Sequence, residues 1–233
     1  AVLKPGREKP VLGGHPWIFS GAVERLDGYN EPGDSCEVLD AAGRRLGFGY
    51  LNTRSQIVCR LVGAEPPGPE LWARRLEAAL GLRARLGLPA AAPAATDAYR
   101  LVNAEGDFLP GLVIDRYGDG LCLQITTAGM ERWRDALVAL LRERLAPAFV
   151  YERSDAPLRR EEGLPPRTGL LAGELPEPLV VREAGLEFAV DLARGHKTGL
   201  YLDQRENRLL AGGLARGAAV LNCFCYTGGF SVH

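Results

Sequence analysis

Two stretches near the end of the chain hold the residue types best suited to binding a small ligand. The first, Gly195–Arg205, contains His-Lys-Thr-Gly, and the second, Ala218–Phe230, is an apolar run that meets the double glycine Gly228-Gly229. An apolar run of strand length bounded by glycine is typical of a strand buried on both faces of a parallel sheet. Glycines after such a strand let the backbone turn sharply and let a ligand approach the main chain.

The double glycine does not by itself identify a ligand. The loop lacks the Gly-Lys-Ser/Thr ending of a phosphate-binding P-loop, and it lacks the Gly-x-Gly-x-x-Gly spacing of a dinucleotide site. On this feature alone, a tight strand-to-helix turn without a ligand is an equal alternative.

The upstream stretch adds a resemblance to a known family. Residues 196–208 resemble the segment Q/H-K-T-G-x-[FY]-L-D-Q-R-x-N, and residues 222–230 resemble the cofactor loop N-x-F-C/S-Y-T-G-G-F. Both segments occur in the PUA-containing large-subunit ribosomal RNA cytosine-C5 methyltransferases. Further matches at the start and in the middle extend the resemblance over all 233 residues. Because family members continue well beyond this point, the resemblance implies an N-terminal portion that ends just inside the catalytic domain.

The resemblance implies S-adenosylmethionine as the cofactor, held by two groups of residues. The first group would line the cofactor or RNA end of the pocket: Lys197, Thr198, Gly199, Tyr201, Gln204 and Arg205. The second group would surround the methionine part: Asn222, Phe224, Tyr226, Thr227, Gly228 and Gly229. Arg205 would pair with the methionine carboxylate, a charge-assisted contact. The alternatives are a salt bridge of Arg205 with Glu206 or Asp203, and a core position for Tyr201.

Methylation at C5 of cytosine needs a cysteine thiolate that adds to C6, and it needs an unstacked base. In the family, the nucleophilic cysteine and its acidic-Pro-Pro segment come later in the sequence. Cys36, Cys59 and Cys122 are expected to be small core residues, and Cys223 and Cys225 to pack on one strand face. We therefore assign no catalytic residue and no metal ligand, because Cys-x-Cys alone is a poor zinc site. The parent protein is expected to methylate, whereas this chain alone is not.

The first 65 residues are expected to form a small RNA-binding barrel. Short apolar runs at 36–39, 46–51 and 57–62, separated by turns, predict strands. With His-Pro-Trp-Ile-Phe at residues 15–19, they resemble the PUA fold of the family. The implied phosphate contacts are Lys4, Arg7, Lys9, Arg44, Arg45 and Arg54. The alternative is an ordinary set of solvated charges, because exposed Lys and Arg are common and the net charge is −1. His15 and Trp17 are expected to serve packing.

Residues 66–178 are expected to form a small α+β domain. Helical faces are predicted around Trp72 and over 133–145, and strands over 99–103, 112–117, 121–127 and 149–153. Residues 90–95 are expected to form an Ala/Pro loop, and residues 159–163 an exposed and mobile one. The family resemblance implies that this domain helps to shape an RNA groove. The alternative for its charged residues is a structural ion network of Arg100, Arg116, Arg153, Asp107 and Asp115.

Residues 179–233 are expected to begin a Rossmann-like methyltransferase domain. A hairpin is predicted over 179–182 and 186–191, followed by a helix capped by Asp203 and running to Arg216. Leu209, Leu210 and Leu214 would be its apolar positions. We expect Val220–Phe224 to be a central strand that is poorly ordered without its neighbours. The fold class is therefore mixed α/β and multidomain.

The expected function is S-adenosylmethionine-dependent transfer of a methyl group to C5 of a cytosine in 23S ribosomal RNA. Alternatives are a non-catalytic RNA-binding module and a methyltransferase that acts on another RNA atom. Five scattered cysteines indicate a reducing cytoplasm, and no apolar stretch approaches the roughly 20 residues of a membrane span. A homodimer is a further expectation.

Overall fold

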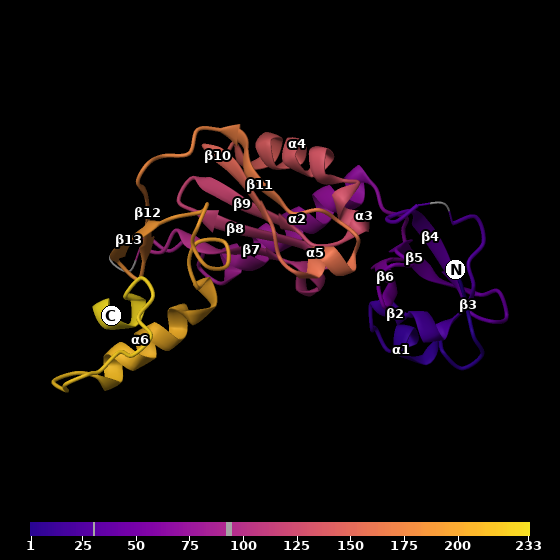
Figure 1. Cartoon of the computed structure of the whole chain (residues 1–233), viewed down its shortest axis with the longest axis horizontal. Helices are drawn as coiled ribbons and strands as arrows, with labels where there is room; N and C mark the ends of the chain where they lie inside the picture. Colours follow the sequence, from indigo (N-terminus) through magenta and orange to yellow (C-terminus); the bar gives the residue numbers. More distant parts are fainter. Residues whose placement is uncertain (30, 92–94) are drawn as a thin grey trace.

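The computed structural model describes residues 1–29, 31–91 and 95–233. Part of the loop expected at residues 90–95 thus lies outside the described residues. Figure 1 shows an arched molecule with one lobe at each end of a central sheet. The N-terminal lobe is joined to the central part near α3 (Ala128–Glu131) and α5 (Leu158–Glu161), and the C-terminal segment forms the opposite end.

The N-terminal lobe contains the strands that the apolar runs predict. Its six-stranded sheet has the order β2-β6-β5-β4-β1-β3, and a short helix, α1, follows β1. Leu3, Ile18, Val38 and Cys59 form its core. The elements are β1 (Val2–Leu3), α1 (Lys9–Leu12), β2 (Trp17–Phe19), η1 (Ser20–Ala22), β3 (Val23–Arg25), β4 (Ser35–Leu39), β5 (Arg45–Leu51) and β6 (Ile57–Gly63).

The central part is a five-stranded sheet of order β11-β10-β9-β8-β7. Only β9 and β10 pair in parallel, because helix α4 connects them and returns the chain to the same end. The elements are α2 (Pro69–Arg85), β7 (Ala98–Asn103), η2 (Ala104–Asp107), β8 (Leu112–Tyr117), β9 (Gly120–Ile125), α3 (Ala128–Glu131), α4 (Arg134–Leu145), β10 (Phe149–Ser154), α5 (Leu158–Glu161) and β11 (Arg167–Gly173).

Strand alternation sends side chains to two different cores. Leu121 and Leu123 of β9 pack with α2 and α4. Trp72 of α2 meets Trp133, the residue just before α4, edge to face at 5.9 Å. Cys122, between the two leucines, points to the opposite face and packs against the C-terminal hairpin. The central sheet thus has helices on one face and the hairpin on the other.

The C-terminal hairpin forms as the alternating pattern predicts. Strands β12 (Leu179–Glu183) and β13 (Leu186–Val190) pair antiparallel, and Phe188 and Val190 face the core. After the hairpin come η3 (Leu202–Gln204), α6 (Arg205–Leu214) and α7 (Gly229–Val232).

Two expectations about this last region are wrong. Helix α6 begins at Arg205 rather than after a cap at Asp203, because a 3-10 turn occupies 202–204. Its leucines at 209, 210 and 214 are exposed, and the buried residue of this helix is Arg208. Helix α6 is therefore held to the hairpin by the ion pair of Arg208 with Glu183, and not by a stripe of apolar side chains.

The apolar run after α6 is also not the strand that the sequence predicts. Residues 220–224 are irregular backbone, and the exposed fraction of Phe224 is 96%. Cys223 and Cys225 are exposed as well, contrary to the expected packing on one face. A strand needs a paired neighbour, and among the described residues β12 and β13 form a sheet of two strands with no third strand beside them.

The loop expected at residues 159–163 is another correction. Helix α5 covers part of it, and Arg159 and Glu162 are each only 1% exposed. The Arg159 guanidinium donates to the carbonyl of Ile125 and to Glu131, both at 2.8 Å. Arg159 and Glu162 are buried because neighbouring elements offer them matching charges and carbonyl groups, whereas Arg160, Glu161 and Gly163 between and after them are exposed as expected.

Glu162 ties the N-terminal lobe to the central sheet. Its carboxylate accepts from Arg60 of β6 at 2.7 Å, from Asn52 at 2.7 Å and from the backbone amide of Ala128 at 3.2 Å. A second contact across the same junction is a hydrogen bond of 2.9 Å from Trp17 Nε1 to Glu105 Oε1. These polar contacts fix the bend between the lobes.

Candidate functional site

The two stretches singled out in the sequence come together around one hollow of about 500 Å³. It lies between the loop that precedes α6, the first turns of α6 and the segment that leads into α7. Of the predicted residues, those that line it are Tyr201, Gln204, Phe224, Tyr226, Thr227 and Gly229; His196, Leu200, Arg208, Cys225 and Phe230 complete the wall. We call this the aromatic hollow.

Three rings form its centre. His196 stacks on Tyr226 with centroids 4.7 Å apart, and Tyr201 meets Tyr226 edge-on at 5.6 Å. The Tyr226 hydroxyl accepts from the His196 amide at 2.8 Å and donates to the Gly199 carbonyl at 3.2 Å. Tyr201 is therefore part of this cluster rather than a core aromatic. The negative faces of such rings attract a cationic group of a ligand.

The predicted glycines serve different purposes. Gly228 has φ +80, a conformation that favours glycine, and it begins the turn into α7. At Gly199, a Cβ atom would lie 2.6 Å from a Val190 methyl carbon. Close packing against β13 therefore explains the glycine at 199.

Thr198 faces the central sheet rather than the hollow. It is 2% exposed, and its hydroxyl donates to Asp115 Oδ2 at 2.6 Å while lying 2.9 Å from the Tyr117 hydroxyl. The amide of Leu200 donates to the same Tyr117 oxygen at 3.3 Å. Burial raises the pKa of Tyr117, so it remains a neutral donor. Asp115, Tyr117 and Thr198 form what we call the brace.

Arg100 and Arg153 extend this support from the central sheet. Arg100 pairs with both oxygens of Asp115, at 2.8 and 3.2 Å, and so confirms one ion pair of the expected network. Arg153 donates to the carbonyls of Leu192 and Gly195, the latter at 3.2 Å. The supporting role of Arg153 has no local sequence signal, because its carbonyl partners are 39 and 42 residues away along the chain.

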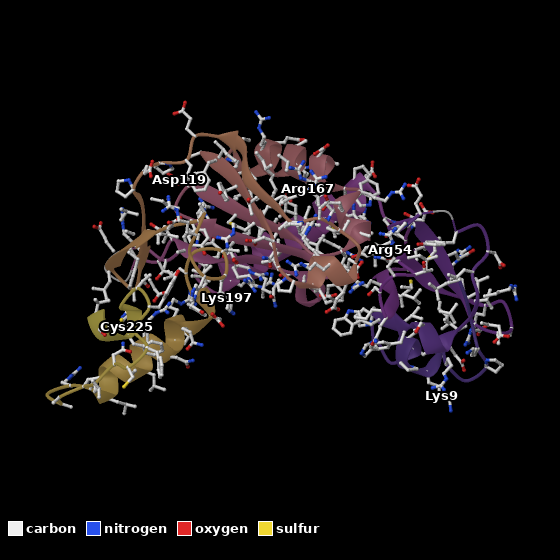
Figure 2. The ribbon with its side chains drawn as sticks, in the orientation of Figure 1. Lys9, Arg54, Asp119, Arg167, Lys197 and Cys225 are labelled. Carbon is white, nitrogen blue, oxygen red and sulfur yellow. The ribbon has the colours of Figure 1, made fainter. Side chains whose placement is uncertain are left out.

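Lys197 and Arg205 line a neighbouring hollow of about 380 Å³, together with Arg100, Asn103 and Asp203. The Lys197 ammonium lies 3.9 Å from Asp203 and 5.4 Å from the Tyr201 ring centroid. Arg205 pairs with Glu206 at 2.9 Å, the salt bridge considered as its alternative role. Figure 2 shows Lys197 near the base of the C-terminal segment and Cys225 farther along it. Asn222 donates to Ser231 at 2.9 Å and so organises the turn that carries Phe224.

A buried ion pair anchors α6 beside the hollow. Arg208 makes two bonds of 2.6 Å to Glu183 of β12 and donates to the Tyr201 carbonyl at 2.9 Å. His233 Nε2 lies 3.3 Å from the same carboxylate. Since two carboxylate bonds already occupy Arg208, its main effect is to hold α6 against the hairpin.

The predicted RNA contacts fall into two sets. Arg44 pairs with Asp40 at 3.0 Å, and Arg45 pairs with Glu37. Lys4, Arg7, Lys9 and Arg54 are exposed and, among the described residues, have no carboxylate within 4.0 Å. Figure 2 places Lys9 at the outer end of the N-terminal lobe and Arg54 at its junction with the central sheet. The six cations therefore do not make one continuous patch.

Comparison with known proteins adds two family matches. Residues 1–63 match a PUA-like domain, and residues 146–233 match an S-adenosylmethionine-dependent methyltransferase family. The chain is 45% identical over 239 aligned residues to a protein of Shewanella amazonensis named Ribosomal RNA large subunit methyltransferase I, and 43% identical to its namesake in Tolumonas auensis. Each alignment covers 99% of this chain and 58% of the relative.

Solved structures agree with these matches. A Streptococcus mutans protein assigned to the SAM-dependent methyltransferases superposes with a TM-score of 0.80, and SMU.776, solved with SAH bound, with 0.82. Both are 28% identical to this chain, cover 99% of it and extend beyond it, since 58% of each is matched. No helix within the described residues has the length and apolarity needed to cross a membrane. The chain thus combines a PUA-like domain with residues of an S-adenosylmethionine-dependent methyltransferase domain, and it is a relative of the proteins named Ribosomal RNA large subunit methyltransferase I.

Proposed function

We propose that the chain binds S-adenosylmethionine at the aromatic hollow and belongs to an enzyme that methylates large-subunit ribosomal RNA. The observation that carries the proposal is the meeting of the His196–Tyr201 loop and the Phe224–Gly229 segment around one hollow. These are the two segments that resemble the family's cofactor motifs. The names of the relatives supply the RNA substrate.

The residues present suit this cofactor. Its sulfonium is cationic, and the faces of Tyr201 and Tyr226 favour a cation. The Lys197 side chain is half exposed, and Lys197 and Arg205 would hold the methionine carboxylate by exchanging Asp203 and Glu206, respectively, for the ligand. Gln204, Asn222, Phe224 and Thr227 complete the proposed binding set, with the bend at Gly228-Gly229 giving access to the main chain. Thr198 and Gly199 contribute by positioning the loop.

The bound cofactor would supply an electrophilic methyl group. The chain's own residues would hold that donor and orient it, through the brace on one side and the pair Arg208–Glu183 on the other. The proposed methyl acceptor is C5 of a cytosine in 23S ribosomal RNA. The proposed catalytic domain begins at residue 179 and has a Rossmann-like fold. The same proposal includes domain boundaries after residues 65 and 178, a cytoplasmic location and a homodimer.

Ligand binding tests the cofactor site. Titration calorimetry with S-adenosylmethionine should give saturable binding that Tyr226→Ala weakens by roughly 5- to 30-fold, because one cation–π contact is worth about 1–2 kcal/mol. Leu170→Ala, an exposed apolar truncation on β11, should bind as the wild type does. Equal affinity of the wild type and Tyr226→Ala would refute the site.

The acceptor needs a second measurement. Large-subunit RNA from cells lacking the gene would be incubated with the protein as expressed in its host and a methyl-labelled donor. Digestion to nucleosides and mass spectrometry should then place the label in 5-methylcytidine. Label in another methylated nucleoside would overturn the cytosine-C5 assignment while leaving the cofactor site intact.

A further inference from the structure

Phe108 is an exposed aromatic residue in a backbone conformation that does not suit it. Phe108 is 71% exposed, although phenylalanine is among the residues most often buried. Its backbone has φ 58 and ψ 27, the left-handed region that bulky side chains rarely adopt. Neither local backbone preference nor core packing therefore explains a phenyl ring at this position.

The turn that presents this ring is firmly held. Asp107, just before it, is buried, pairs with Arg83 at 2.5 Å and accepts from the Asn103 amide at 2.6 Å. Leu109, just after it, is buried in the main core. The exposed ring thus projects from a rigid base.

A cation lies beside the ring. The Arg75 guanidinium donates to the Phe108 carbonyl, and its central carbon lies 6.0 Å from the Phe108 ring centroid and 5.8 Å from that of Trp72. Within the described part of the chain, no carboxylate approaches Arg75 within 4.0 Å. Its positive charge is therefore available to an anionic partner.

The ring borders a groove of about 520 Å³ between the N-terminal lobe and the central sheet. Pro16, Leu61 and Val62 line one side, and Gly106 and Pro110 line the other. In Figure 1, β2 and β6 of the N-terminal lobe face the central sheet across this bend. The one carboxylate in the lining, Glu105, is already engaged by Trp17 at 2.9 Å and by Arg60 at 4.0 Å.

We propose that this groove takes an unpaired base of an RNA strand, stacked on Phe108, with the adjoining phosphate at Arg75. An exposed ring, an apolar groove and an unpaired guanidinium match the means by which proteins hold single-stranded RNA. A paired base hides both of its faces in the stack, so the site selects a loop, bulge or end over a duplex. The inference rests on the proposed RNA substrate and narrows it to RNA with an unpaired segment at the junction of the lobes.

The test is RNA affinity measured without a methyl donor, so that a failure of methyl transfer leaves its result unaffected. The probe is a fluorescein-labelled single-stranded RNA of mixed sequence, and a perfect duplex of the same sequence serves as the comparison. Phe108→Ala should weaken single-strand binding about 5- to 150-fold, the range for losing one aromatic–base stack. Phe108→Trp should restore affinity to within about threefold of the wild type. Leu170→Ala, which removes a similarly exposed apolar group elsewhere, is the matched control.

A second variant addresses the phosphate contact. Arg75→Gln should lower the slope of log affinity against log salt concentration by about 0.7, the value for one phosphate on a single strand. Unchanged single-strand affinity in folded Phe108→Ala would overturn the proposal, as would an equal loss for the duplex. Sedimentation showing a wild-type dimer that Phe108→Ala dissociates would also overturn it, because the ring would then be a contact between copies of the chain.

Discussion

Replacing Thr198 by valine tests the brace that connects the central sheet to the proposed cofactor loop. Valine keeps the shape of the side chain and removes only the hydroxyl. That hydroxyl bonds the fully buried Asp115 at 2.6 Å and the buried Tyr117 hydroxyl at 2.9 Å. The variant therefore removes one hydrogen bond that the Asp115 carboxylate accepts, and it removes the acceptor of the Tyr117 hydroxyl.

The expected cost follows from these two bonds. A hydrogen bond to a charged group contributes about 1.5–3 kcal/mol, and an unsatisfied buried donor costs about 1–3 kcal/mol. Because the vacated site can relax, we expect Thr198→Val to lower the free energy of unfolding by about 2–3 kcal/mol. In a chain of this length, that corresponds to a fall of roughly 4–12 °C in the melting temperature.

Urea denaturation followed by circular dichroism measures the change, and calorimetry with S-adenosylhomocysteine measures its effect on the loop. Thr168→Val, on the exposed face of β11, makes the same chemical change without a buried partner and should stay within about 0.5 kcal/mol of the wild type. A double-mutant cycle with Asp115→Asn should show a coupling energy of at least about 0.5 kcal/mol. A Thr198→Val protein as stable as the Thr168→Val control would refute the reasoning.

Two further perturbations probe the N-terminal lobe and its junction. Gly129→Ala should destabilise the protein by about 1–3 kcal/mol in urea, because the new Cβ would lie 2.0 Å from the Tyr50 ring; Gly213→Ala, in open space on α6, should not. Backbone amides of Arg44 and Ala42 hold the pKa of Asp40 below its ordinary value of 3.8. The stability that Asp40 contributes is therefore complete above pH 3.8 and lost as pH falls through the lower, folded-state pKa. Asp40→Asn should flatten the pH dependence of unfolding there, and an acid limb as steep as that of the wild type would contradict this.

Local sequence patterns were sufficient to predict secondary structure where a segment buries one face against an adjacent segment. The runs at 36–39, 46–51 and 57–62 correspond to β4, β5 and β6, and the alternation of Leu186, Phe188 and Val190 to a hairpin strand. In such segments, side-chain period and turn residues decide the structure. The family motifs likewise identified the segments that line the aromatic hollow.

For charged residues, the local sequence pattern was insufficient to predict whether the side chain is buried. Arg159 and Glu162 have the composition of an exposed loop, yet both are buried, because Glu131, Arg60 and Asn52 meet them from distant parts of the chain. Burial of a charge depends on its partners, and partners up to 110 residues away cannot be read from spacing. For the same reason, the apolar character of Val220–Phe224 predicts a strand, but a strand requires a neighbour to pair with.

The order of residues along the chain was thus enough to establish the relationship to methyltransferases, most strands of the first two lobes and the two segments of the candidate site. Only tertiary structure showed that Thr198 turns towards Asp115, that Arg208 is held by Glu183, and that the ring of Phe108 stands free beside Arg75. The physical reason is that helix and strand periodicity arise from neighbours within a few residues, whereas the direction and charge state of a polar side chain are set by groups that folding brings near.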